Sequence, residues 1–181
     1  MEYILDLQGF KTMKNELIVK ELANMSTDAS VYELHLFQPP CSFNELLVNE
    51  RKQVVWLERH YHGLYWNSGF RPYDELKDVF ANMKIEGKVY VKGGEKKAVV
   101  TELLNAFDVE VINIEDFGCP NLKILKQQYA PAFLKPCNFD HGVKNCAYIN
   151  VQIISEWLKH EEVLWRNLNE EDVTKTGEIQ K

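Results

Sequence analysis

Lys88-Val89-Tyr90-Val91-Lys92-Gly93-Gly94 is the stretch that decides the fold class. Its apolar centre is typical of a buried strand, and the two glycines indicate a turn directly after it. A helical pattern follows over residues 95–107, and a second short apolar run follows over residues 109–113. A strand, a helix and a strand in this order predict two parallel strands joined by a right-handed crossover. We therefore expect an α/β protein.

Three further apolar runs precede this unit, over residues 3–7, 17–23 and 31–37. The third run alternates with period two and ends at Pro39-Pro40, which cannot continue a strand ladder. Because short turns separate the runs, we expect an antiparallel meander, with a turn at Gln8-Gly9 after the first strand. Together with the strand–helix–strand unit, this predicts a mixed five-stranded sheet flanked by helices.

Helical patterns fill most of the remaining chain. Ser42 and Glu45 form a capping-box pattern before apolar residues that recur at helical spacing up to Leu57. Further helices are expected over residues 73–83, 121–129, 145–159 and 161–168. From residue 169 onward the sequence is polar. We expect one domain over residues 1–168 and a flexible C-terminal tail over residues 169–181.

Composition restricts the class of protein. No apolar run reaches the roughly 20 residues that a membrane-spanning helix needs, and no basic leader precedes an apolar stretch at the N-terminus. We therefore expect a cytoplasmic protein, although the sequence does not separate cytoplasm from nucleus. The net charge of −6 argues against non-specific duplex binding. Basic residues nevertheless cluster locally, which leaves room for a basic groove: Lys92, Lys96 and Lys97, and Lys123, Lys126 and Lys135.

Cys137, His141 and Cys146 lie within ten residues of one another. Thiolate sulfur and imidazole nitrogen are the ligands that zinc prefers, and structural zinc sites usually have four protein ligands. The fourth ligand would come from elsewhere, and Glu21 and Cys119 are the two candidates by residue type. The alternative interpretation is two ordinary semi-buried thiols and a solvated histidine.

Three other groups are candidates for chemistry. Asp6 ends the first predicted strand, where a two-metal nuclease places a carboxylate, but it also fits a simple turn. The lysines Lys92, Lys96 and Lys97 surround a glycine turn before a helix, where backbone N–H groups can contact phosphate. Aromatic side chains over residues 56–73 suit either base stacking or ordinary packing.

Several short motifs resemble the DEDDh exonuclease family and, more closely, its degenerate relative, the Maelstrom domain of the piRNA pathway. Ile4-Leu5-Asp6-Leu7-Gln8-Gly9 resembles the family's first strand, and Val19-Lys20-Glu21-Leu22-Ala23 resembles the second. Leu36-Phe37-Gln38-Pro39, His62-Gly63-Leu64 and Cys146-Ala147-Tyr148-Ile149-Asn150 follow in the family's order. The resemblance implies a ribonuclease H-like (DnaQ exonuclease-like) fold.

The departures from the exonuclease pattern bear on activity. Of the family's acids only Asp6 persists, while Gln8, Cys146 and Asn150 stand where a second acid, the general-base histidine and the last aspartate belong. One carboxylate and two amides cannot hold two divalent cations beside phosphates. We therefore expect that two-metal exonuclease activity is lost.

The Maelstrom resemblance implies a Glu-Cys-His-Cys zinc site, which maps to Glu21, Cys137, His141 and Cys146. It further implies binding to single-stranded RNA and to small-RNA silencing partners. The expected function is a zinc-stabilised, catalytically degenerate module that binds single-stranded RNA or a silencing-pathway protein, with Lys92, Lys96 and Lys97 as candidate RNA contacts. The alternatives are a metal-independent single-stranded RNA endonuclease and a pure protein-interaction domain.

Overall fold

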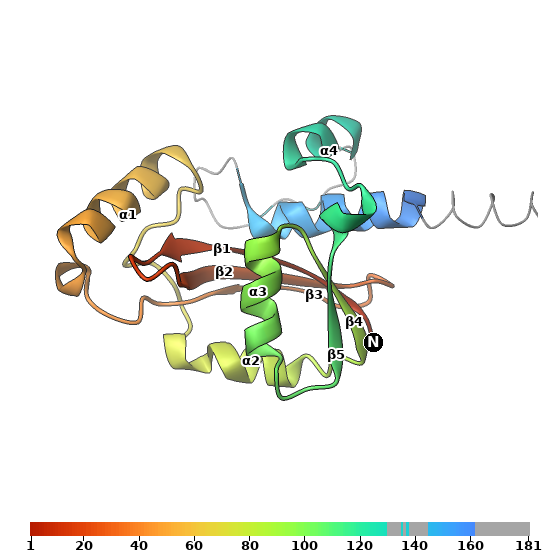
Figure 1. The fold of residues 1–181 in the computed structure, drawn as a ribbon, viewed down its shortest axis with the longest axis horizontal. Helices are drawn as coiled ribbons and strands as arrows, with labels where there is room; N and C mark the ends of the chain where they lie inside the picture. The colour runs from red at the N-terminus through yellow and green to blue at the C-terminus, as the bar shows by residue number, and fades with distance from the viewer. Residues whose placement is uncertain (130–134, 136, 138–144, 162–181) are drawn as a thin grey trace, which may run out of the picture.

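A computed structural model describes residues 1–129, 135, 137 and 145–161. Its centre is a five-stranded sheet with the order β3-β2-β1-β4-β5 (Figure 1). The strands are β1 (Tyr3–Lys11), β2 (Leu17–Ser26), β3 (Tyr32–Leu36), β4 (Gly87–Val91) and β5 (Val109–Asn113). The first three strands pair antiparallel, whereas β4 runs parallel to both β1 and β5. The prediction of an α/β protein with a mixed five-stranded sheet is therefore confirmed.

Helices occupy the connections that the sequence predicts. They are α1 (Val48–His60), α2 (Leu76–Asn82), α3 (Gly94–Leu103) and α4 (Leu122–Tyr129), with short 3-10 helices η1 (Phe43–Glu45), η2 (Tyr73–Glu75) and η3 (Ile114–Phe117). A C-terminal helix spans residues 147–161. The expected helix over residues 161–168 and the expected tail over residues 169–181 lie outside the described residues, apart from residue 161.

The capping box at Ser42 has a more local role than expected. Glu45 accepts a hydrogen bond from the Ser42 N–H at 2.6 Å, but the turn that these residues cap is η1 alone. The long helix α1 begins at Val48, where Glu50 accepts a hydrogen bond from the Leu47 N–H at 3.0 Å. A second carboxylate at the third helical position therefore starts α1, and the sequence pattern around Ser42 did not separate the two starts.

Two layers of helix cover the two faces of the sheet (Figure 1). One face packs against α2 and α3 through a hydrophobic cluster that includes Leu5, Leu7 and Val89. The opposite face packs against α4 and the C-terminal helix through a cluster that includes Ile4, Leu125 and Ile154. Because successive side chains of a strand alternate between faces, β1 contributes to both layers. The strand that carries Asp6 is thus central and buried.

The Gln8-Gly9 pair lies inside β1 and does not end it, which corrects the predicted turn. The pairing register between β1 and β2 shifts there, so that Gln8 faces Glu21 while Gly9 faces Val19. Lys20 is the additional residue of this β-bulge. A Cβ atom on Gly9 would lie 1.9 Å from the Ile18 carbonyl oxygen, so only glycine allows the two backbones to approach this closely. The bulge therefore fixes the position of Glu21 on the face that carries the C-terminal helix.

In the part of the chain that the structure describes, no helix is both long enough and apolar enough to cross a membrane.

Replacing Gly9 with alanine is expected to destabilise the protein. The new methyl group would collide with the Ile18 carbonyl, and both strands are central, so we expect the free energy of unfolding to fall by about 2 kcal/mol or more. Gly94→Ala is the matched control, because a Cβ atom there meets no atom within 4 Å and alanine favours the helix that Gly94 begins. Chemical denaturation of the two variants measures both effects. Equal stability of Gly9→Ala and the unmodified protein would contradict the role given to the bulge.

Candidate functional site

Glu21, Cys137 and Cys146 come together although 116 residues separate the first two in the sequence (137 − 21 = 116). One ligand atom from each lies within 4.8 Å of those of the other two. Glu21 comes from the centre of β2, and Cys146 immediately precedes the C-terminal helix. Among the residues that the structure describes, this is the one group of three or more such side chains placed to hold a metal ion.

The surroundings of Glu21 show how this group is built. Its carboxylate is completely buried; one oxygen accepts the Ala147 N–H at 3.2 Å and the other accepts the Cys146 thiol at 3.5 Å. The Ala147 N–H belongs to the first turn of a helix, where such groups lack a partner within the helix and favour an anion. The β2 carboxylate thus caps the C-terminal helix and places it against the sheet.

The protonation of Cys146 depends on what fills the space between these ligands. Burial and the nearby Glu21 carboxylate both raise the pKa of the Cys146 thiol well above its usual range, so the free thiol stays protonated. A bound cation reverses this balance because a coordinating thiol is deprotonated by the metal. Two sulfur atoms and one carboxylate are a donor set that suits a divalent transition metal, so the residues present fit a metal ion.

The remaining candidates for this site are placed differently. His141 lies outside the described residues. Cys119 belongs to the hydrophobic cluster beneath the C-terminal helix, and its thiol lies 3.7 Å from the Pro120 carbonyl oxygen. Burial raises the pKa of Cys119 to about 11. Of the two candidates for the fourth ligand, the structure therefore gathers Glu21 with Cys137 and Cys146, and Cys119 is not part of that group.

A second buried carboxylate, Asp6, lies on the neighbouring strand and is only 1% exposed. One of its oxygens forms an ion pair with the Lys96 ammonium group, contributed by the first turn of α3. The other accepts the Asn150 amide at 2.7 Å and the Gln8 amide at 3.4 Å. Both carboxylate oxygens are thus satisfied by protein groups.

This arrangement limits the chemistry that Asp6 can perform. Two-metal catalysis needs several carboxylates that face one another across two cations. Among the described residues Asp6 belongs to no group of three metal-binding side chains, and its charge is already balanced by Lys96. Gln8 and Asn150, which stand where the exonuclease pattern has acids, are hydrogen-bond donors to Asp6. The Lys96 ammonium group supplies the positive charge that this buried carboxylate needs.

The three lysines predicted as RNA contacts are not equivalent. Lys92 is buried, and its ammonium group donates to Glu115 at 2.6 Å. Lys96 binds Asp6. Lys97 is half-buried, and within the described ranges its side chain has no ion-pair partner. Two of the three therefore have structural partners, and Lys92 in particular serves to hold η3 beside β4.

Lys126 is the residue of this region that the site prediction missed. It comes from α4, its ammonium group lies 3.5 Å from the Asn145 side-chain oxygen, and it is half-buried. Burial lowers the pKa of Lys126. The charges of Asp6 and Cys146 raise this pKa and the charge of Lys96 lowers it, so all three groups act on Lys126 electrostatically. The clustering of Lys123, Lys126 and Lys135 in the sequence was the signal, but it did not indicate which of them is half-buried beside Asn145.

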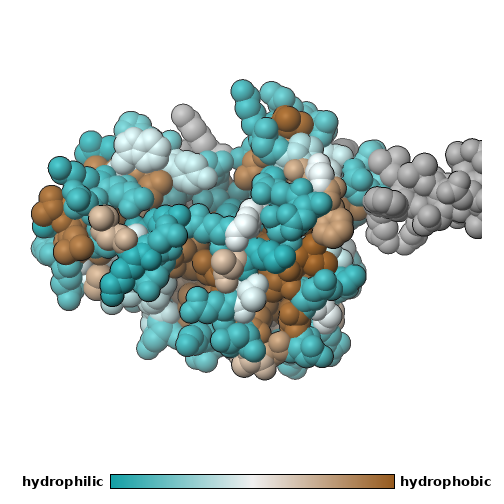
Figure 2. Space-filling model, viewed as in Figure 1, coloured by the Kyte–Doolittle hydropathy of each residue, from teal (hydrophilic) through white to brown (hydrophobic). Residues whose placement is uncertain are grey.

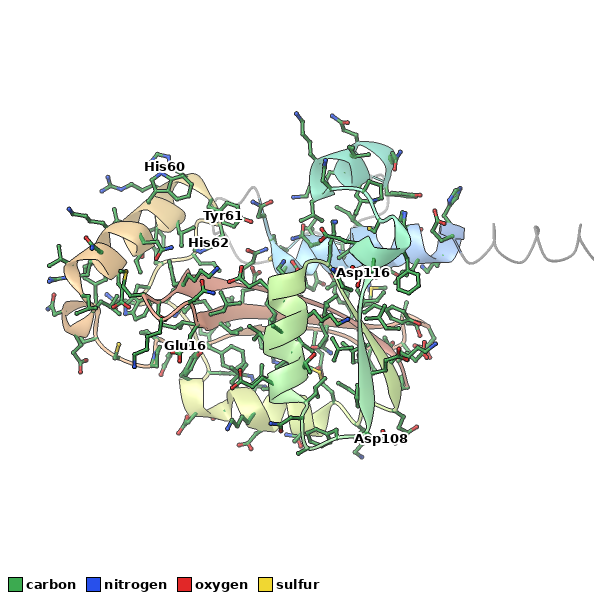
Figure 3. All side chains as sticks on the ribbon, viewed as in Figure 1. Glu16, His60, Tyr61, His62, Asp108 and Asp116 are labelled. Carbon is green, nitrogen blue, oxygen red and sulfur yellow. The ribbon has the colours of Figure 1, made fainter. Side chains whose placement is uncertain are left out.

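The aromatic group around the end of α1 is divided between core and surface. Trp66 is buried against Phe10, whereas four other rings are 45% to 73% exposed: Trp56, Tyr61, Tyr65 and Phe70. Figure 3 shows His60, Tyr61 and His62 together at the end of α1. His62 is buried there, with its ring nitrogen 3.1 Å from the Gly9 carbonyl oxygen. Packing explains Trp66 and His62, whereas the rings of Trp56, Tyr61 and Tyr65 are exposed on the surface.

A cavity with a volume of about 630 Å³ lies away from these clusters. It opens where β1 and β4 begin, and its lining includes Ile4, Tyr90 and Trp157. None of the groups around Asp6 or Glu21 contributes to it.

A comparison of the chain with models of known protein families finds no match, and a comparison with curated protein sequences finds none either.

Proposed function

We propose that this protein is a zinc-stabilised, catalytically degenerate module of the ribonuclease H-like exonuclease type that binds single-stranded RNA. The observation that carries this proposal is the state of Asp6. The one acid that persists from the exonuclease pattern is buried, paired with Lys96 and hydrogen-bonded to Asn150. The burial and pairing of Asp6 support a protein that has kept the architecture of a nuclease fold and has lost the two-metal chemistry.

The sheet supports the fold part of the proposal. An antiparallel meander followed by two strands parallel to its first strand is what the resemblance to the exonuclease family implies. The motif residues also converge: Asp6 and Gln8 from β1 meet Asn150 from the C-terminal helix. In the sequence, only the order of the motifs relates Asp6 and Gln8 to Asn150. In the structure, the Gln8 and Asn150 amides both lie within hydrogen-bonding distance of Asp6.

The donor set supports zinc as the metal. Glu21, Cys137 and Cys146 would hold the ion, with His141 as the fourth ligand that the resemblance implies. When bound, the ion would supply positive charge between two thiolates and a carboxylate and would link β2 to the start of the C-terminal helix. In this role zinc contributes stability, because metal binding to a site formed only in the folded state adds its binding free energy to folding.

Two surface properties support single-stranded RNA as the ligand. Trp56, Tyr61 and Tyr65 are exposed, and such rings can stack on unpaired bases. Trp56 also lies 5.7 Å from the His60 ring, so the exposed group continues along α1. Hydrophilic side chains cover much of the face that carries α1, α3 and α4 (Figure 2). The net charge of −6 disfavours non-specific duplex binding, which depends on neutralising many phosphates.

Removal of the metal is expected to destabilise the protein. Purified without chelator, it should contain about one zinc per chain, and Cys146→Ser should lose the metal. A site saturated at about a thousand times its Kd contributes roughly 4 kcal/mol, which for a chain of this size lowers Tm by about 10 °C when it is lost. Cys41→Ser is the matched control, since Cys41 is a free thiol outside the cluster. Metal analysis and thermal melts with and without chelator measure both quantities. Unchanged Tm after complete chelation would contradict a structural ion.

The function is tested by binding and cleavage assays on the same protein. We expect a labelled unstructured oligoribonucleotide to bind at low salt, with weaker binding of the same sequence as a duplex. Addition of Mg²⁺ or Mn²⁺ should produce no exonuclease ladder, because Asp6 is paired with Lys96. Fluorescence anisotropy and denaturing gels give the two readouts. Absence of any RNA affinity would favour a pure protein-interaction domain. Cleavage that persists in chelator and disappears in a point variant of the region around Asp6 would favour a metal-independent endonuclease.

A further inference from the structure

The solvent-facing side of α1 carries two cations around an exposed tryptophan. We propose that this side of the helix binds the single-stranded RNA, with a base stacked on Trp56 and backbone phosphates bound by Lys52 and Arg59. The inference rests on the proposed function and names the surface that would hold the ligand. It differs from the lysine set expected from the sequence, in which Lys92 and Lys96 already have structural partners.

The helical spacing of α1 places these three side chains together. The opposite side of the helix is buried through Val54, which belongs to the same hydrophobic cluster as Phe10. Lys52, Trp56 and Arg59 follow one another at intervals of four and three residues, so they share one side of the helix, and all three are exposed. With a rise of 1.5 Å per residue, the two cations lie about 10 Å apart along the axis, with the tryptophan between them.

The two acidic residues of α1 do not neutralise these cations. The Glu50 carboxylate accepts two backbone N–H groups, at 2.9 and 3.0 Å, and the Glu58 carboxylate accepts the Trp66 N–H at 2.7 Å. None of the exposed residues of α1 is acidic. Within the described ranges neither Lys52 nor Arg59 has an ion-pair partner. This side of α1 is therefore locally positive on a protein whose net charge is −6, which favours an anionic ligand at this place.

The aromatic side chains select the kind of anion. Trp56 is 55% exposed, and its ring lies 5.7 Å from that of His60, the last residue of α1. Tyr61 and Tyr65 continue the exposed aromatic surface beyond the helix. An unpaired base of any type offers a flat face that can stack on such rings, whereas the bases of a duplex are stacked on one another. The aromatic surface therefore favours a single strand.

The combination favours RNA over a protein partner. The buried centre of a protein–protein interface is depleted in charged residues, and lysine is among the residues that interfaces contain least. In α1 the most exposed tryptophan surface instead has a cation on each side along the helix. Sites for single-stranded nucleic acid combine positive charge along the backbone with aromatic rings for the bases. Lys52, Trp56 and Arg59 supply both parts on one helix.

Separate variants test the two parts. Lys52→Gln combined with Arg59→Gln removes both cations. Trp56→Ala removes the ring, and Trp56→Phe keeps an aromatic face at the same position. Lys77→Gln combined with Lys84→Gln is the matched control for two lost charges, because both lysines are exposed in or directly after α2 and have no ion-pair partner among the described residues.

Binding of a dye-labelled oligouridylate of about 12 nucleotides is measured by fluorescence anisotropy from low to moderate salt. We expect the Lys52 and Arg59 double variant to raise Kd about tenfold at low salt and to reduce the slope of log K against log salt by about 1.4, which is about 0.7 for each lost phosphate contact. Trp56→Ala should raise Kd about fivefold or more with an unchanged slope, because stacking releases no counterions. Trp56→Phe should restore most of the affinity, and the control should match the unmodified protein.

The outcomes separate this inference from the function on which it rests. If the unmodified protein binds RNA and the Lys52 and Arg59 double variant keeps the Kd and salt slope of the control, α1 is not the RNA surface, although RNA binding stands. If the unmodified protein binds no RNA at low salt, the function and the surface are both wrong. A change of oligomeric state in the α1 variants, seen by size-exclusion chromatography with unchanged RNA affinity, would identify a protein interface and overturn the inference.

Thermal melts verify that each variant is folded. Should Trp56→Ala fail to fold, the Lys52 and Arg59 double variant decides alone, because both of its side chains are exposed and substitution there leaves the buried side of α1 unchanged.

Discussion

Two carboxylates buried on neighbouring strands are the constraint on which the rest of this structure depends. Asp6 on β1 and Glu21 on β2 are both almost completely buried, and each must be compensated because an unpaired buried charge is costly. One turn of the C-terminal helix provides hydrogen-bond donors to both carboxylates. Its Ala147 N–H binds Glu21, and its Asn150 side chain binds Asp6. Positions three residues apart lie on one face of a helix, so a single helix can serve two adjacent strands.

The further contacts of the two carboxylates differ in kind. Asp6 receives the Lys96 ammonium group from the start of α3. Glu21 receives the Cys146 thiol, a weak donor, and lies beside Cys137. The thiol contact does not neutralise a charge, whereas a divalent cation between the two sulfurs and the carboxylate would. The donor set of Glu21, Cys137 and Cys146 is therefore a chemical argument for a cation at this position that is independent of any resemblance.

Much of the fold followed from the sequence because local patterns decide it. The strand–helix–strand unit around Val89 and the period-two alternation near Leu34 are determined by burial on the two faces of a sheet. The bulge at Gly9 was not predictable as such. A glycine after a strand also signals a turn, and only the approach of the Ile18 carbonyl distinguishes the two. For the same reason the length of β1 was underestimated.

The candidate site was predictable to the extent that residue chemistry is specific. Two cysteines and a histidine within ten residues predicted a metal site at Cys137, His141 and Cys146. Residue type left Glu21 and Cys119 open as the fourth ligand, and only the resemblance to the Maelstrom domain favoured Glu21. Lysines are less informative, since they serve equally as solvated charges, ion-pair partners and ligands. Lys92 and Lys96 look alike in the sequence, and only their placement separates the partner of Glu115 from the partner of Asp6.

The Lys96 ammonium group explains how the Asp6 carboxylate can be buried at the centre of the sheet. It supplies the positive charge that a buried carboxylate requires. Once Asp6 is paired, further acids at the site would only add repulsion, and neutral amides such as Gln8 and Asn150 are the better neighbours. Both oxygens of the buried Asp6 carboxylate are therefore occupied by protein donors, one by Lys96 and the other by the two amides.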